Sequence, residues 1–308
     1  MRILTGAAAA ARVRKLAARG MRYSEIEPAV RRIIDDVRRN GDRALRKYAE
    51  RWDGLPPGTP LPVFEQEIEA AWKSAAPDLK ASLRAAAANI RRFCEWQKPE
   101  GWRRTRKGIT LGQIVRPLES VGCYIPGGRY PLVSTLLMTV IPAQVAGVRD
   151  IRVASPQPRA ELLAAAGLLG VREVYRMGGA QAIAALAFGT ESVPRVDKVV
   201  GPGNVYVTAA KKLVSFDCAI DFLAGPTEVV IVSDSGKPPF IAADLVAQAE
   251  HDPEALAVFI TSRNNLACQV LRVTEKLSQR NVVARRSLRR AGVILVSDSR
   301  RQNPGVGE

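Results

Sequence analysis

Residues 120–170 decide the fold class, and they read SVGCYIPGGRYPLVSTLLMTVIPAQVAGVRDIRVASPQPRAELLAAAGLLG. Short β-rich runs (SVGCYIP, DIRVASP) alternate here with longer runs rich in alanine and leucine (LVSTLLMTVIPAQVAGV, ELLAAAGLLG). The first kind of run predicts buried strands, and the second kind predicts helices. A strand, a helical crossover and another strand imply a parallel sheet that is covered on both faces.

The same alternation continues towards the carboxyl end. It runs through VREVYRM, GAQAIAALAFG, DKVVG, NVYVTAAKKLVS and CAIDFLAG. A second set follows, with EVVIVSD, FIAADLVAQAEH, ALAVFITS, NLACQVLRVTEKLSQR and GVILVSD. Two Rossmann-like parallel-sheet units fit this length better than one long sheet.

The chain before about residue 118 is predicted to be mostly helical. Apolar residues between residues 26 and 48 recur every three or four positions, and Asn40-Gly41 is expected to break this helical stretch. A second helical stretch follows, with a break near Pro77. The opening MRILTGAAAAARVRKLAARG superficially resembles a transit peptide, and an amphipathic first helix explains it equally well. The predicted fold class is therefore α/β, with two Rossmann-like units and an N-terminal helical segment.

Charge and composition limit the classes of partner. The formal net charge of +16 invites a nucleic-acid interpretation, but aromatic residues are sparse and no nucleic-acid-binding motif is present. Solvated helix faces explain the excess of arginine better, so nucleic acid is not the expected partner. No apolar run reaches the roughly 18 residues that a membrane span needs. The four cysteines are widely separated, which suggests neither a thiolate metal cage nor a disulfide framework and favours a reducing cytoplasm.

Three predicted strand-to-helix turns are rich in glycine or proline: YIPGGRYP at 124–131, MGGAQA at 177–182 and GPGN at 201–204. Such turns leave backbone N–H groups free at a helix start, at the sheet edge where α/β proteins bind ligands. None reads G-x-G-x-x-G, and each alone could simply shape a tight turn. Together they favour a ligand site, because each also offers a hydrogen-bonding side chain (Tyr124, Gln181 and Asn204).

The only histidine of the chain lies in VAQAEHDP, residues 246–253. Gln248 and His251 are three positions apart on an expected helix, so both side chains project from one face, as a shared metal requires. Imidazole is a good zinc ligand, whereas a carboxamide oxygen is a weaker one. On the residues alone, a structural histidine with satisfied hydrogen bonds remains the alternative.

Four motifs occur in one order: VGCYIPGGRYPLVSTLLMTVIPAQVAGV, YRMGGAQAIAALAFGTESVPRVDKVVGPGN, DFLAGPTEVVIVSDSG and DLVAQAEHDP. Together they resemble the histidinol dehydrogenase family, from about residue 25 to 298. The resemblance implies a zinc-dependent homodimer that oxidises L-histidinol through histidinal to L-histidine. Two NAD molecules accept the hydrides, in the last two steps of histidine biosynthesis.

The resemblance also implies roles for residues and a domain division. Three groups of positions match family sites: NAD contacts at Tyr124, Gln181 and Asn204; zinc ligands that also face the substrate at Gln248 and His251; and a substrate contact at Thr227. One domain is expected to combine residues 1–118 with 227–308. The other, residues 119–226, is expected to be an inserted NAD-binding domain.

The resemblance ends near Ser299, where the chain continues as SRRQNPGVGE. Family members carry a Glu-His pair in a P-E-H segment just beyond the strand that GVILVSD matches; the histidine is the general base and the glutamate activates water. That pair and the remaining zinc ligands, an Asp and a His, are not found here. No catalytic residue is therefore assigned, and we expect a truncated member of doubtful activity. A non-catalytic nucleotide-binding remnant and a basic nucleic-acid-binding protein stay as alternatives.

Overall fold

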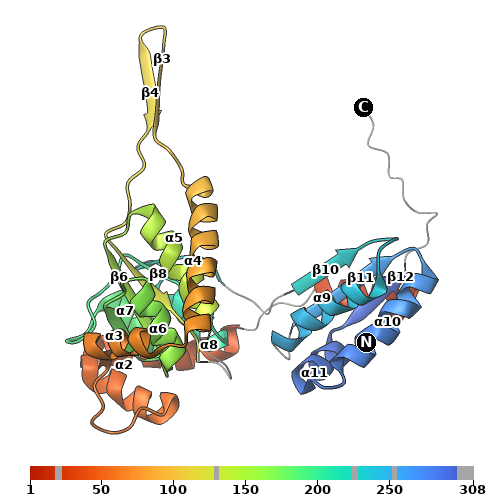
Figure 1. Ribbon diagram of the computed structural model, residues 1–308, viewed down its shortest axis with the longest axis horizontal. Helices are drawn as coiled ribbons and strands as arrows, with labels where there is room; N and C mark the ends of the chain where they lie inside the picture. The colour runs from red at the N-terminus through yellow and green to blue at the C-terminus, as the bar shows by residue number, and fades with distance from the viewer. Residues whose placement is uncertain (18–22, 128–131, 224–227, 252–254, 297–308) are drawn as a thin grey trace. The chain divides into compact units, whose positions relative to one another are not determined.

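A computed structural model describes residues 1–17, 23–127, 132–223, 228–251 and 255–296 (Figure 1). The chain separates into two compact units, each of which is described by itself. One consists of residues 22–224, and the other combines residues 1–21 with 225–308. The first boundary differs from the expected one at residue 118, because the helices of residues 23–97 pack on the sheet of residues 120–220. The second boundary lies close to the expected residue 227.

Unit 22–224 is built on a six-stranded sheet in the order β2-β7-β6-β5-β8-β9. All neighbouring strands are parallel except the short edge strand β2, which pairs antiparallel with β7. The parallel part of the sheet starts at β5, continues outward through β6 and β7, and then resumes on the other side of β5 with β8. The strands are β2 (Pro62–Val63), β5 (Ser120–Tyr124), β6 (Asp150–Ser155), β7 (Glu173–Arg176), β8 (Lys198–Val200) and β9 (Ala219–Ile220).

Helices cover both faces of this sheet, as the sequence predicted. The alternation of side chains along β5 divides the core: Val121 and Cys123 pack on one face and Tyr124 on the other. The first face is covered by α3 (Glu65–Ser74), α4 (Pro77–Gln97), α5 (Val133–Ala146) and α6 (Ala160–Leu168). The second is covered by α2 (Tyr23–Tyr48), α7 (Gly179–Phe188) and α8 (Val205–Val214).

Helix α2 carries the segment that leads into the functional site. Its buried residues Val30, Ile33, Ile34 and Val37 lie at helical spacing and join the core formed with α7 and α8. Each such side chain contributes about 1.5–3 kcal/mol by leaving water. The helix kinks at Gly41, whose φ of 50° confirms the predicted break in the helix. It then passes into a π-helical turn, η1 (Ala49–Asp53), that ends at Gly54 with φ 68°.

The segment between α4 and β5 contains a hairpin where a helical pattern was predicted. Strands β3 (Trp102–Arg106) and β4 (Ile109–Gln113) pair antiparallel and stand away from the rest of unit 22–224 (Figure 1). Lys107 and Gly108 form the two-residue turn with positive φ values of 49° and 78°. Positive φ at both positions is the type I′ geometry that suits the twist of a hairpin.

The other unit contains a four-stranded, fully parallel sheet in the order β1-β12-β11-β10. One of its edges is β1, although the opening of the sequence was interpreted as a helix; a strand precedes that helix, α1. The strands are β1 (Arg2–Thr5), β10 (Glu228–Val232), β11 (Leu256–Thr261) and β12 (Val293–Val296). Helices α9 (Pro238–His251), α10 (Asn264–Ser278) and α11 (Val282–Arg290) form one core with it, and α1 (Gly6–Ala17) packs on its other face. The predicted α/β class with parallel sheets is confirmed.

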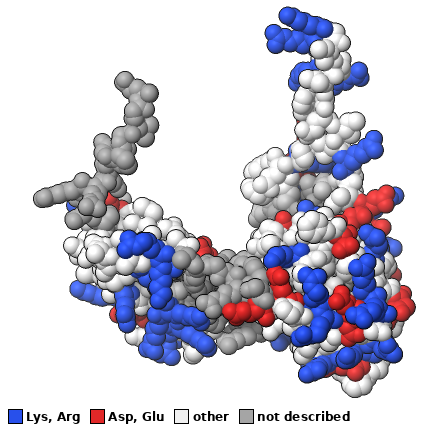
Figure 2. Space-filling view, turned by 180° about the vertical axis from the view of Figure 1, so that it is seen from behind, with Lys and Arg blue, Asp and Glu red and all other residues white. Residues whose placement is uncertain are grey.

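The charged side chains are spread over the surface. Figure 2 shows Lys and Arg on both units and along the hairpin, with Asp and Glu interspersed among them mainly on unit 22–224. This mixture agrees with solvated helix faces as the main source of the net charge. None of the helices in the described ranges has the length and apolarity needed to cross a bilayer.

Candidate nucleotide site

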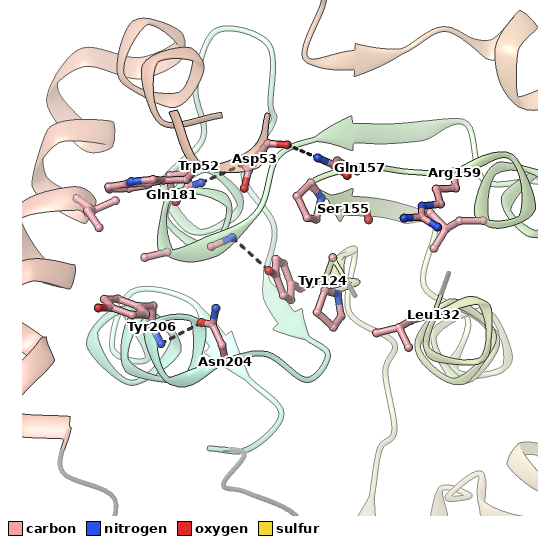
Figure 3. A pocket seen from close by; sticks show the side chains of 17 residues that line it. Trp52, Asp53, Tyr124, Leu132, Ser155, Gln157, Arg159, Gln181, Asn204 and Tyr206 are labelled. Carbon is pink, nitrogen blue, oxygen red and sulfur yellow. Dashed lines mark hydrogen bonds between the residues drawn. The ribbon is translucent and has the colours of Figure 1, made fainter. Parts of the chain in front are cut away.

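A cavity of about 660 Å³ lies at the carboxyl ends of the parallel strands of unit 22–224 (Figure 3). Every strand from β5 to β8 contributes to it through the loop that follows. The lining residues used below are Asp53, Tyr124, Gln157, Arg159, Gln181 and Asn204. This position is where α/β sheets bind ligands, because the strand order reverses beside β5.

Tyr124 is the last residue of β5 and is almost completely buried. Its hydroxyl oxygen accepts a hydrogen bond of 3.1 Å from the backbone N–H of Gly179, at the start of α7. Burial raises the pKa of Tyr124 to about 12, so the hydroxyl keeps its proton at neutral pH. The phenol can therefore still donate one hydrogen bond to a ligand.

Gln181, in the first turn of α7, is held by an aspartate from a distant part of the chain. Its Nε2 donates to Oδ2 of Asp53 at 3.1 Å, and the N–H of Gly178 donates to the same oxygen at 2.8 Å. Because the amide nitrogen is used in this way, Gln181 can offer its carbonyl oxygen as an acceptor. A Cβ at Gly178 would lie 2.7 Å from Asp53 Oδ1, so only glycine lets the carboxylate approach this closely.

Asp53 is a site residue that the sequence did not reveal. It begins the segment DGLPPGTPLP, which is rich in proline and therefore indicates a connection between helices and not a ligand site. In the structure it is 9% exposed and closes one wall of the cavity. Burial raises the pKa of Asp53, and the hydrogen bonds from Gly178 and Gln181 oppose that increase.

Asn204 caps helix α8 and lines the cavity from the side opposite Asp53 (Figure 3). Its Oδ1 accepts from the N–H groups of Tyr206 and Val207 at 3.0 and 3.1 Å. With its oxygen bound to the helix start, the side chain can offer its amide hydrogens to a ligand. This is the asparagine of the GPGN turn, so the structure brings the three predicted cofactor contacts around one cavity.

A buried ion pair holds the GPGN turn in place. Lys211, whose side chain is 2% exposed, pairs with Asp221 and also donates to the carbonyl of Gly201 at 3.0 Å. Asp221 in turn accepts from the N–H of Gly201 at 2.8 Å. Gly201 has a φ of 117°, and a Cβ there would lie 2.2 Å from the carbonyl oxygen of Tyr124. The GPGN turn therefore packs directly against the end of β5.

The groups around the cavity fit a nucleotide cofactor. Tyr124, Asn204 and Arg159 can donate hydrogen bonds, Asp53 and Gln181 can accept them, and Arg159 supplies a positive charge for a phosphate. The volume lies within the usual range of about 300–1,000 Å³ for small-molecule sites.

The predicted metal positions lie on α9 in the other unit. Gln248 is half-buried, and its Nε2 has no hydrogen-bond partner in the part of the chain that the structure describes. His251 is the last residue of the same helix, which confirms the helical spacing of the two positions; its side chain and the whole of Thr227 lie outside the described residues. Within the described ranges no cluster of three or more His, Cys, Asp or Glu could hold a metal. One carboxamide and one imidazole do not complete a four-coordinate zinc site.

Comparison with known proteins identifies relatives over nearly the whole chain. The profile of the family described as histidinol dehydrogenase matches residues 16–305. The histidinol dehydrogenase of Methanothermobacter thermautotrophicus is 47% identical over 275 residues, which are 86% of this chain and 64% of the relative. That of Geobacter sulfurreducens is 46% identical over 286 residues, 89% of this chain and 67% of the relative.

A solved structure agrees with these sequence matches. The crystal structure of histidinol dehydrogenase from Elizabethkingia anophelis superimposes with a TM-score of 0.88 at 35% identity, covering 97% of this chain and 71% of that one. The chain thus spans about two thirds of the length of the curated relatives that it matches, from 64% to 67% for the two named above. On the profile match and on these identities, the chain belongs to the histidinol dehydrogenase family.

Proposed function

We propose that unit 22–224 binds NAD in the cavity at the carboxyl ends of β5 to β8. The observation that carries the proposal is the convergence of Tyr124, Gln181 and Asn204 on one cavity beside the point where the strand order reverses. These residues end or follow three different strands and are up to 80 positions apart in the chain. A folding requirement alone does not demand hydrogen-bonding side chains at all three turns.

Each of the polar side chains that line the cavity has a role in this proposal. Arg159 and the amide of Asn204 bind the negatively charged phosphates, whereas Tyr124 and Gln181 offer a donor and an acceptor for hydroxyl or amide groups. The first turn of α8 reinforces the phosphate side, because the N-terminus of a helix carries a partial positive charge.

For members of the family to which this chain belongs, the proposed reaction is the NAD-dependent oxidation of L-histidinol to L-histidine in histidine biosynthesis. The enzyme is proposed to be a homodimer in the cytoplasm. Thr227, Gln248 and His251 are proposed to contact the substrate, and Gln248 and His251 to bind zinc. When bound, zinc would position the imidazole and amino nitrogens of the substrate. The unpartnered Nε2 of Gln248 supports a ligand at this position.

The 308-residue polypeptide is proposed to bind NAD without efficient turnover of histidinol. It contains a single histidine, so it cannot supply both an imidazole zinc ligand and a separate histidine base. The proposal therefore combines membership of an oxidoreductase family with the non-catalytic alternative: the cavity residues support NAD binding, and the Glu-His pair expected from the family is not found in these residues.

Calorimetric titration with NAD tests the cofactor site. Gln181→Met removes the hydrogen-bonding amide at similar volume and is expected to weaken NAD binding about tenfold. Gln113→Met, the same change on the exposed hairpin strand β4, is the matched control and should leave the affinity unchanged. If the unaltered chain does not bind NAD at millimolar concentration, the proposed function is wrong.

A further inference from the structure

The two oxygens of the Asp53 carboxylate have different surroundings. Oδ2 accepts both hydrogen bonds to this side chain, from the N–H of Gly178 and the Nε2 of Gln181. Oδ1 has no hydrogen-bond donor within reach among the described residues, although the carboxylate lines the cavity. One oxygen therefore holds the start of α7, while the other is available to a ligand.

The place of Asp53 in the sheet suggests which part of a ligand it meets. In the Rossmann arrangement the strand order is 3-2-1-4-5, and an acidic residue near the end of the second strand binds the ribose hydroxyls of NAD. The order β7-β6-β5-β8-β9 is this arrangement, with β6 as the second strand. At the end of β6, however, the chain reads Ser155-Pro156-Gln157, without an acid.

Asp53 occupies the place of that missing acid. Nε2 of Gln157 donates to the backbone carbonyl of Asp53 at 2.8 Å, which fixes η1 beside the loop after β6 (Figure 3). The carboxylate then reaches the start of α7, which follows β7. An aspartate about 100 positions earlier in the chain thus stands where a Rossmann sheet usually carries its ribose-binding acid.

We propose that Asp53 binds the 2′- and 3′-hydroxyls of the adenosine ribose of NAD and rejects a 2′-phosphate, so that the site selects NAD over NADP. This inference rests on the proposed NAD site. A carboxylate accepts hydrogen bonds and donates none, which suits a pair of hydroxyl donors. A phosphate brought against a carboxylate that is screened from water meets strong repulsion. Arg159 is assigned to the pyrophosphate rather than to a 2′-phosphate.

The substitution Asp53→Asn separates this role from a structural one. With the asparagine oxygen placed at Oδ2, both hydrogen bonds to α7 are kept, and only the ligand-facing oxygen becomes an amide nitrogen. Asp150→Asn is the matched control, since Asp150 is an exposed aspartate at the amino end of β6, on the opposite edge of the same sheet. Thermal unfolding of both variants checks that they are folded.

Affinities for NAD, NADP, AMP and 2′-deoxy-AMP are then measured by calorimetry for the three proteins. The unaltered chain should bind NAD at least about tenfold more tightly than NADP, and AMP more tightly than 2′-deoxy-AMP. In Asp53→Asn both ratios should fall towards one, whereas Asp150→Asn should keep them. A purely structural role would weaken all four ligands by the same factor and leave the ratios unchanged.

Two results would overturn the inference while leaving the NAD site intact. One is NAD binding with both ratios unchanged in Asp53→Asn. The other is a preference of the unaltered chain for NADP, which would assign Arg159 to a 2′-phosphate. If none of the four ligands binds, the NAD site itself is refuted, together with the inference.

Discussion

Unit 22–224 surrounds one cavity with its own residues, whereas the described part of the unit of residues 1–21 and 225–308 holds no cluster of three or more His, Cys, Asp or Glu around its proposed metal positions. In the first unit, Asp53, Tyr124, Gln181 and Asn204 surround one cavity and are held by further hydrogen bonds. In the second, Gln248 lies on α9 with an unpartnered amide nitrogen. The comparison teaches that the proposed cofactor contacts and the proposed metal positions lie in different units of the chain, so the two proposals can be tested separately.

The largest expected effect is the loss of turnover. The 308-residue chain should oxidise L-histidinol at least about 10⁴-fold more slowly than the Geobacter sulfurreducens relative, because general acid–base catalysis alone contributes about 10²–10⁴-fold and metal assistance adds to it. NADH formation under identical conditions measures this. Turnover at the rate of the relative would break the comparison, since it would require another residue to act as the base.

Zinc binding should be weak in the isolated chain. Complete structural sites bind zinc with about 10–16 kcal/mol, and two ligands fall well short of this, so we expect a dissociation constant above about 1 µM. Competition with a chromophoric chelator gives the value, and Gln248→Ala should change it only a few-fold. Stoichiometric zinc that survives dialysis, and that is lost in Gln248→Ala, would show a completed site.

Removing the cation beneath the GPGN turn should destabilise unit 22–224. Lys211→Met leaves Asp221 without its buried partner, which costs about 3–5 kcal/mol of unfolding free energy. The double variant with Asp221→Asn should recover part of this loss, because no unpaired charge remains. Lys212→Met is the control, since Lys212 is 47% exposed and surface pairs contribute at most about 1 kcal/mol. Urea unfolding compares them; equal effects at both lysines would contradict the role of the buried pair.

The hydroxyl of Tyr124 should contribute a few-fold to NAD affinity at any pH from 7 to 10. Its pKa of about 12 keeps it protonated throughout, so the ratio of dissociation constants between Tyr124→Phe and the unaltered chain should stay near 5, as expected for about 1 kcal/mol. Titrations at several pH values check this. A ratio that falls to one near pH 9 would mean that the phenol ionises in the accessible range.

The smallest expected effect is a gain of stability in Asp53→Asn. Burial raises the folded-state pKa of Asp53, so the aspartate costs stability as the pH rises from its ordinary value of 3.8 through that raised pKa. The asparagine avoids this cost, so the melting temperature of the variant at pH 7 should be higher than that of the unaltered chain. The difference should shrink as the pH is lowered towards 4. A lower melting temperature at pH 7 would show that the charge stabilises the fold.

The strands, helices and turns that were predicted correctly are those that a local sequence pattern defines. Strand and helix alternate visibly from residue 120 onward because buried parallel strands are short apolar runs and the crossovers are rich in alanine and leucine. The three ligand turns were found for the same reason, since each lies between a strand and a helix that can be recognised. These are features that a window of about 15 residues contains.

The features that were missed depend on distant partners or on exposed surfaces. Strand β1 is defined by its pairing with β12, and RILT alone does not reveal that partner. The hairpin β3–β4 is exposed along both strands, so no buried face defines it, and the short apolar alternation in ITLGQ was not recognised as a strand. Asp53 became a site residue only because α2 packs against α7 and places η1 over the cavity.

The pairing of β1 with β12 has a consequence for how the protein is made. Arg2 lies beside Val293 in the sheet, so β1 can pair only after residues about 290 positions later have been synthesised. At the usual 5–20 residues per second, this interval is roughly 15–60 s. Unit 22–224 can fold within that time, and nascent chains should therefore bind nucleotide before the parallel sheet of the other unit has closed.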